Sequence, residues 1–235
     1  MVTELEDFMV AEPYQPTQNE KNAIKELVDK GLVGDDWDSG KKYIKSFKAN
    51  LREDMYEKQN KLCAYCRVHV PLACVHLHRD HIVYKDEHPQ WLFLPENLCV
   101  ACDCCNEFKG TDEVLLNPNT KTYPNSGDGF KIIHPLYDKY SEHIDLIGGI
   151  LYHGKTDKGI FTIKTCHLYR VELAEERADQ KRHNQNKGNI VAELVYLTTL
   201  SDAYVDKNDK FLKYVTGIAK GIVKEYQQRQ GRKEE

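Results

Sequence analysis

The feature that most constrains the fold of this chain is two Cys-x-x-Cys pairs separated by 35 residues: Cys63 with Cys66, and Cys102 with Cys105. A two-residue gap lets a tight turn direct both sulfurs toward one ion, and two such pairs complete a tetrahedral thiolate site that suits Zn²⁺. Because four thiolates leave zinc no open position, such a site is structural and its binding energy contributes to folding. The alternative is two unrelated pairs or one redox pair, although no βαβ pattern surrounds either of them.

The choice of the second pair is not unique from spacing alone. Cys99 and Cys102 also stand at Cys-x-x-Cys spacing, whereas Cys104 breaks it and is better explained as a spare thiol. Two further cysteines, Cys74 and Cys166, fit neither pair.

Composition predicts a soluble globular protein of one large or two small domains, since 235 residues with 40% hydrophobic content can bury a core. The acidic start does not resemble a signal peptide, and no apolar run approaches the ~18 residues of a membrane span. We therefore expect no membrane association and a cytoplasmic location, where thiols stay reduced and eight cysteines indicate metal binding or catalysis. The net charge of −4 excludes binding to nucleic acid through bulk charge.

The expected fold class is α+β, in three segments. Residues 1–40 form an acidic segment, with ten acidic residues against three lysines, that is either solvated or docks on a basic partner. Thr17 and Glu20 predict a capping box that begins a short helix there. A second helix, over about 41–60, is predicted by apolar residues at helical spacing that lead directly into Cys63. These are Ile44, Phe47, Leu51 and Met55.

Residues 41–115 form the Cys/His core, and residues 116–235 a C-terminal hairpin plus helical extension. Within the extension, "FKIIHP", "HIDLIGGILYHG" and "GIFTIKTCHL" are short apolar runs separated by glycine-containing turns, so we expect a hairpin or small antiparallel sheet. Two helices are expected after it, over about 168–197 and 202–228.

Polar residues between the cysteine pairs suggest chemistry as well as structure. Asp80 and His81 lie in a strand-like run, and Asn97 and Asn106 follow on the far side of a loop. A zinc ion would hold the two ends of this excursion together, so that Asp80, His81 and Asn106 could converge. Neighbouring side chains of a flat strand point to opposite faces, so convergence requires strong twist or a strand end at this position.

In order, these elements resemble the HNH endonucleases, the zinc-stapled branch of the ββα-metal nucleases. They read "CAYC" (63–66), "DHI" (80–82), "NL" (97–98) and "ACDCCNEFKG" (101–110). The resemblance covers about residues 40–112, and its last block selects Cys102 with Cys105 as the second zinc pair. The chain departs from the family where a proline often follows the Asp-His-Ile segment, since Val83 and Tyr84 stand there.

The resemblance implies a ββα-metal core in which His81 is the general base and Asp80 and Asn106 hold Mg²⁺ or Mn²⁺. Asn97 would brace the hairpin and orient the histidine. A neutral imidazole can take a proton from water at neutral pH, and hard oxygen ligands leave room for a divalent ion to hold the scissile phosphate. The implied activity is hydrolysis of phosphodiester bonds, with DNA as the favoured substrate.

The arrangement also resembles the small HNH subunits of bacterial anti-phage systems such as the Septu-type and retron-associated nucleases, which implies antiviral defence and an ATPase partner. Two alternatives stay open. The substrate could be RNA, for example transfer RNA, or the chain could be a non-catalytic zinc module that binds nucleic acid or protein.

Some polar residues have two interpretations each. Lys109 either contacts phosphate or is a solvated helix lysine, and His76 and His78 either support the metal from a second layer or are exposed hairpin histidines. A histidine-rich stretch suggests a second metal site, but its spacing matches no ligand pattern, so we favour turn or hairpin roles. Its members are His134, Asp138 and His143.

Overall fold

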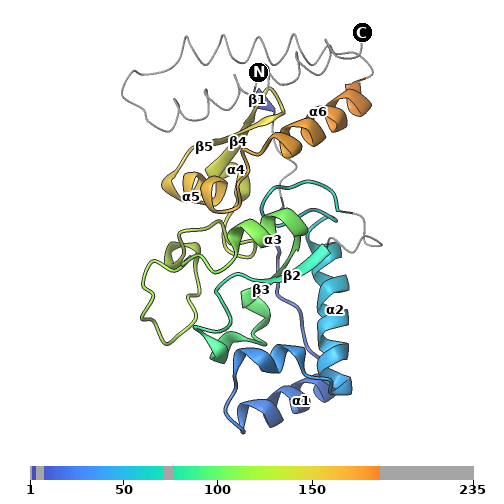
Figure 1. The fold of residues 1–235 in the computed structure, drawn as a ribbon, viewed down its shortest axis with the longest axis vertical. Helices are drawn as coiled ribbons and strands as arrows, with labels where there is room; N and C mark the ends of the chain where they lie inside the picture. The colour runs from blue at the N-terminus through green and yellow to red at the C-terminus, as the bar shows by residue number, and fades with distance from the viewer. Residues whose placement is uncertain (1, 4–7, 71–76, 186–235) are drawn as a thin grey trace, which may run out of the picture. The chain divides into compact units, whose positions relative to one another are not determined.

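The computed structural model describes residues 2–3, 8–70 and 77–185, which form a mixed α+β structure with two small sheets (Figure 1). The chain divides into two compact units. The core unit comprises Glu6–Ile144 and Gly154–His167, and the terminal unit comprises Met1–Leu5, Asp145–His153 and Leu168–Glu235. The mixed α+β class is therefore confirmed, whereas the expected division at residues 40 and 115 stays a prediction.

Two helices begin the core unit, as predicted. Helix α1 (Gln18–Val28) starts with a capping box, in which the Thr17 backbone N–H donates to Glu20 Oε2 (2.9 Å) and the Glu20 N–H donates to Thr17 Oγ1 (3.4 Å). Helix α2 (Lys42–Lys58) buries the predicted apolar stripe completely and packs on the strands that follow. Its Phe47 ring makes an edge contact with Phe93 at 5.7 Å between centroids. The stripe thus anchors the element that leads into the first cysteine pair.

The centre of the core unit is a hairpin followed immediately by a helix. Strands β2 (Leu77–His81) and β3 (Leu98–Cys102) pair antiparallel, with Leu77 opposite Cys102 and His81 opposite Leu98. Helix α3 (Asp103–Lys109) begins directly after β3. Asp80 and His81 therefore end one strand, and the second cysteine pair spans the junction of the other strand with α3.

Short elements complete the core unit. The 3-10 helices are η1 (Gly34–Asp38), η2 (Pro89–Trp91), η3 (Pro95–Asn97) and η4 (Gly127–Gly129), and helix α4 is Tyr140–His143. Of these, η2 and η3 lie in the connection between β2 and β3.

The terminal unit contains the predicted hairpin. Strands β4 (Ile144–Ile147) and β5 (Leu151–Gly154) flank Gly148 and Gly149, whose φ angles of 62° and 74° fit a turn that favours glycine. Strand β1 (Val2–Thr3) adds to the outer edge of β4. Helix α6 (Val171–Gln185) packs Ala174 and Ala178 against Ile150.

Two strand predictions were wrong. "GIFTIKTCHL" was expected in the sheet, but most of it forms helix α5 (Asp157–Thr165). The Thr156 hydroxyl accepts from the Gly159 N–H and caps the helix, and Thr162 and Ile163 are fully buried at helical spacing from Gly159. "FKIIHP" forms one isolated bridge, Phe130 with Leu115, and no strand. There Ile133 donates its N–H to the Thr162 hydroxyl (2.9 Å), so a side chain replaces a strand partner.

Helix α6 ends at Gln185, within the predicted 168–197. The rest of that prediction and the whole of 202–228 lie outside the described residues. Within the part of the chain that is described, no helix is long and apolar enough to cross a membrane.

Candidate metal centre

The two predicted cysteine pairs meet in the core unit. The sulfurs of Cys63, Cys66, Cys102 and Cys105 all lie within 4.8 Å of one another. Zinc with four Zn–S bonds of ~2.3 Å would place neighbouring sulfurs about 3.8 Å apart. The measured Cys66–Cys102 separation is 3.9 Å. The four cysteines can therefore bind a metal ion such as zinc, and the donor set is the one that zinc prefers.

Local backbone geometry prepares the first pair for a shared ion. The chain leaves α2 and turns tightly, because the Cys63 N–H donates to the Val68 carbonyl (2.9 Å) and the Arg67 N–H donates to the Cys63 carbonyl (3.1 Å). Arg67 adopts a left-handed φ of 55°, which closes the turn. The Tyr65 N–H points at the Cys63 sulfur, 3.5 Å away. This turn is joined to the hairpin by a hydrogen bond from the Ala64 N–H to the Val100 carbonyl (3.0 Å).

The electrostatics of the quartet favour a cation. Burial would raise the pKa of the Cys63 thiol, but hydrogen bonds from the Cys102, Cys105 and Cys66 thiols outweigh it and lower this pKa well below its usual value. Burial and the hydrogen bonds with Cys102, Cys63 and Cys66 raise the pKa of Cys105. A metal ion would draw the remaining protons off the quartet, because cysteine binds a metal as the thiolate.

The structure also decides between the competing second pairs. Cys99 is fully buried away from the quartet, with its thiol directed at the Tyr65 hydroxyl (3.7 Å). Cys104 is exposed, as expected for a spare thiol, and Cys166 is buried. Cys74 lies outside the described residues. Cys102 with Cys105 is therefore the second pair of the quartet.

Asp80 lies in a buried cluster with two partners that the sequence did not indicate. The residue is 5% exposed, and its carboxylate accepts from the Tyr65 hydroxyl (Oδ2, 2.5 Å) and from Lys109 Nζ (Oδ1, 3.1 Å). Lys109 is only 2% exposed and also donates to the His81 carbonyl (2.9 Å). The interpretation of Lys109 as a solvated lysine was therefore wrong. Burial raises the pKa of Asp80, although Lys109 and Tyr65 both oppose that shift.

The imidazole of His81 has different neighbours. Its Nε2 lies 3.0 Å from the Leu92 carbonyl, and its ring meets the Trp37 ring edge-on at 4.5 Å. Burial lowers the pKa of His81 to about 4, so the ring is neutral at pH 7. Because a carbonyl can only accept, Nε2 must carry the proton and Nδ1 is the basic nitrogen.

Asn97 is fully buried where the connection between the strands returns to β3. Its Oδ1 accepts from the Val83 N–H (2.8 Å), and its Nδ2 donates to the carbonyls of Val83 (3.1 Å) and Trp91 (3.3 Å). The Ile82 N–H donates to the Asn97 carbonyl (2.9 Å). Asn97 thus fixes the backbone that follows His81.

Asn106 is half-buried on α3, three residues before Lys109, so the two share a helix face. Within the described residues, no hydrogen bond joins its side chain to Asp80 or His81. Asp80 also belongs to neither of the two groups of potential ligands that these residues form. The structure therefore places Asp80 and His81 side by side on β2 but gives their side chains separate partners.

The structure gives most of the remaining polar residues partners within the protein. His78 pairs with Asp103 (2.8 Å) at the surface, as an exposed hairpin histidine does, and His76 lies outside the described residues. Asp138 accepts from the His134 N–H (2.7 Å) and pairs with Lys158 (2.8 Å), which supports the expected turn role over a second metal site. Burial lowers the pKa of His134 to about 3.

A second group of potential ligands was missed from the sequence: Glu87, His88 and Glu113. Glu113 stands 25 residues after His88, and this spacing carries no ligand pattern. Comparison with known proteins adds no identification, since no family model and no curated protein matches the chain.

Proposed function

We propose that this chain is a metal-dependent HNH-type endonuclease that hydrolyses phosphodiester bonds in DNA. The observation that carries the proposal is a neutral histidine beside a carboxylate at the end of β2, in a hairpin and helix joined by the cysteine quartet. In this proposal β2, β3 and α3 are the ββα-metal core, and the quartet holds a structural zinc.

His81 would act as the general base. Its Nε2 proton is directed at the Leu92 carbonyl, so Nδ1 is left to accept a proton from water. A pKa of about 4 keeps the ring neutral but makes it a weak base. A phosphate anion nearby would raise this pKa toward neutral pH and increase the basicity when substrate is bound.

Asp80 and Asn106 would hold Mg²⁺ or Mn²⁺, which would neutralise charge on the phosphate and the leaving oxygen. The Lys109 ammonium now occupies Asp80 Oδ1. Metal binding then requires Lys109 to give up this contact, so that the ion replaces the ammonium at the carboxylate. Asn106, on the same face of α3 as Lys109, would supply the amide oxygen.

The burial of Asp80 favours one rival function. A carboxylate that is 5% exposed and bonded to Tyr65 and Lys109 is also what a purely structural ion pair looks like. In that case the chain is a non-catalytic zinc module that binds nucleic acid or protein, and Asp80 stabilises the hairpin.

Cleavage assays separate the two functions. The chain, alone and with the product of its neighbouring gene, is incubated with plasmid, single-stranded DNA and total RNA in Mg²⁺ or Mn²⁺. We expect DNA cleavage that His81→Ala reduces by at least about 100-fold, with zinc content and thermal unfolding retained. His78→Ala is the matched control, because the partly exposed His78 lies on the same strand and pairs with Asp103 at the surface. Full activity of His81→Ala would exclude this mechanism.

The assay also tests the substrate and the partner. Cleavage of RNA alone would replace DNA as the substrate while keeping the chemistry. We include an ATPase partner in the proposal, and activity that appears only with the neighbouring gene product supports it. No cleavage under any condition favours the binding module.

A further inference from the structure

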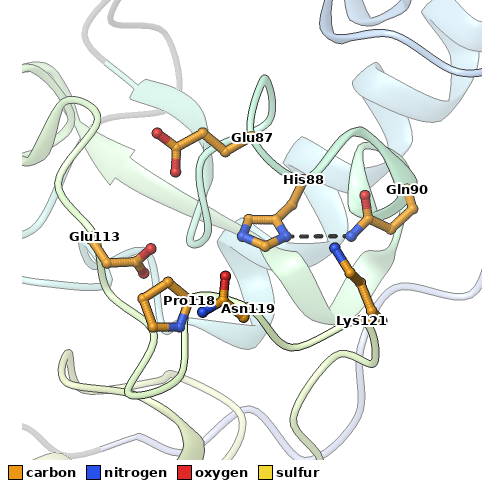
Figure 2. Close-up of a pocket in the computed structure, with 7 residues that line it drawn as sticks. All are labelled: Glu87, His88, Gln90, Glu113, Pro118, Asn119 and Lys121. Atoms are coloured by element: carbon orange, nitrogen blue, oxygen red, sulfur yellow. Dashed lines mark hydrogen bonds between the residues drawn. The ribbon is translucent and has the colours of Figure 1, made fainter.

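A surface hollow of about 480 Å³ lies beside the β2–β3 connection, within the core unit (Figure 2). It is lined from two directions: by Glu87 and His88, which follow β2, and by Glu113, which follows α3. Four other residues complete the lining, and they are Gln90, Pro118, Asn119 and Lys121.

Three potential ligand atoms converge in this hollow. One atom from each of Glu87, His88 and Glu113 lies within 4.8 Å of the others. An ion with bonds of about 2.1 to 2.4 Å can link atoms up to about twice that length apart, so one ion can reach all three. Neither Lys121 nor another described cation forms an ion pair with these two carboxylates.

His88 distinguishes this group from a cluster of surface acids. Its side chain is buried, with a residue exposure of 8%, and its ring stacks on Trp91 at 4.4 Å between centroids and 8° between planes. Its Nδ1 lies 3.3 Å from the amide nitrogen Nε2 of Gln90. Figure 2 shows the other ring nitrogen turned away from Gln90, on the side of the two glutamates. That nitrogen has no hydrogen-bond partner among the described residues.

The contact with Gln90 can fix His88 as a metal ligand once the carboxamide exchanges its nitrogen for its oxygen, a rotation that keeps the shape of the side chain. When the Gln90 carboxamide turns its oxygen toward Nδ1, it accepts the Nδ1 proton and leaves the lone pair of Nε2 directed into the hollow. A hydrogen bond of this kind commonly fixes a histidine ligand. Glu113 is also held in place, because its Oε1 accepts from the Leu115 N–H (2.6 Å). Exposed Glu87 is then the ligand that adjusts.

We propose that Glu87, His88 and Glu113 form a further metal site, separate from the cysteine quartet and from Asp80, for a divalent first-row transition ion. One imidazole and two carboxylates make a mixed nitrogen and oxygen set, which suits Mn²⁺ or Zn²⁺. The ion would join the β2–β3 connection to the segment after α3. This site does not depend on the proposed nuclease activity.

Binding of Mn²⁺ to the zinc-loaded full chain tests the site, measured by the electron paramagnetic resonance signal of free Mn²⁺. Zinc already fills the thiolate quartet, and Asp80→Asn removes a ligand of the proposed catalytic ion. In that variant we expect one bound Mn²⁺, whose affinity falls at least tenfold with Glu87→Gln or Glu113→Gln. Glu53→Gln, an exposed glutamate on α2, is the matched control and should change nothing.

Gln90→Ala tests the orientation of His88 without removing a ligand, and we expect about a tenfold loss of Mn²⁺ affinity. Zinc content and circular dichroism report whether each variant folds. Equal Mn²⁺ affinity in wild type and both glutamate variants would overturn the site. So would Mn²⁺ binding that disappears with Asp80→Asn alone. Cleavage assays decide the nuclease proposal separately, because they depend on His81.

Discussion

The two ends of the β2–β3 hairpin carry polar side chains of different kinds, thiols at one end and a carboxylate with an imidazole at the other. At one end the cysteine quartet brings four soft ligands within 4.8 Å, ready for one ion. At the other end Asp80 and His81 have separate protein partners, Lys109 and Leu92. The difference shows that the quartet is already arranged for an ion, whereas an ion at Asp80, as proposed, would first have to displace the internal contact with Lys109.

The largest effect should come from the quartet. Cys105→Ser should release about one zinc per chain and unfold the hairpin and α3, since a structural zinc site contributes on the order of 10 kcal/mol of binding energy. Cys104→Ser is the control, because Cys104 is the exposed neighbour of a ligand. Zinc content and circular dichroism measure the result. If Cys105→Ser kept its zinc, the quartet would not be the binding site.

At the opposite end, the buried ion pair should contribute less. Lys109→Met should destabilise the chain by about 3 to 5 kcal/mol, because it leaves the Asp80 charge buried with one partner fewer. Urea unfolding measures the loss, and Lys45→Met, an exposed lysine on α2, is the control. If Mg²⁺ or Mn²⁺ stabilises Lys109→Met more than it stabilises wild type, the ion takes the place of the ammonium. If neither ion stabilises Lys109→Met more than wild type, the result argues against a catalytic ion at Asp80.

Removing the hydroxyl of Tyr65 should have a smaller effect. Tyr65→Phe deletes the hydrogen bond to Asp80 Oδ2 but keeps the ring and the Lys109 contact, so we expect a loss of about 1 to 2 kcal/mol. Chemical denaturation provides the value. A loss as large as that of Lys109→Met would mean that the hydroxyl, and not the ammonium, mainly compensates the carboxylate.

The pH dependence of stability should show whether protonation of the quartet or of a buried histidine destabilises the fold in acid. Burial lowers the pKa of His134 to about 3 from 6.5, so the folded protein keeps this ring neutral. Below pH 6.5 the unfolded chain takes up the proton first, and the free energy of unfolding falls as the pH falls toward 3. Between pH 7.5 and 5.5 this amounts to about 1 kcal/mol. His134→Gln should abolish this pH-dependent loss of stability, and His78→Gln should not. Urea unfolding at both pH values measures the loss in each variant. An unchanged slope in His134→Gln would assign the loss to other groups, such as His81, whose pKa burial also lowers, or the cysteines.

Local sequence patterns predicted much of the fold. The stripe from Ile44 to Met55 gave α2 correctly, the Gly148–Gly149 pair gave the hairpin, and Thr17 with Glu20 gave the cap of α1. Each depends on residues close in sequence, where spacing and dihedral preference decide. The segment of α5 was misread because β-branched residues favour strands only where a partner strand is available.

The sequence by itself determined that two Cys-x-x-Cys pairs could share one ion, because the two-residue spacing sets a turn that directs both sulfurs of a pair the same way. Spacing left Cys99 and Cys105 open as partners of Cys102, and the fold brings Cys105 into the quartet. Only the tertiary structure decided what Asp80 contacts, because Tyr65 and Lys109 come from a turn and a helix that lie far from it in sequence. The same holds for Glu87, His88 and Glu113, whose proximity is created by the packing of the β2–β3 connection beside the segment after α3. Side-chain direction and long-range contact are properties of packing, and local sequence spacing does not specify them.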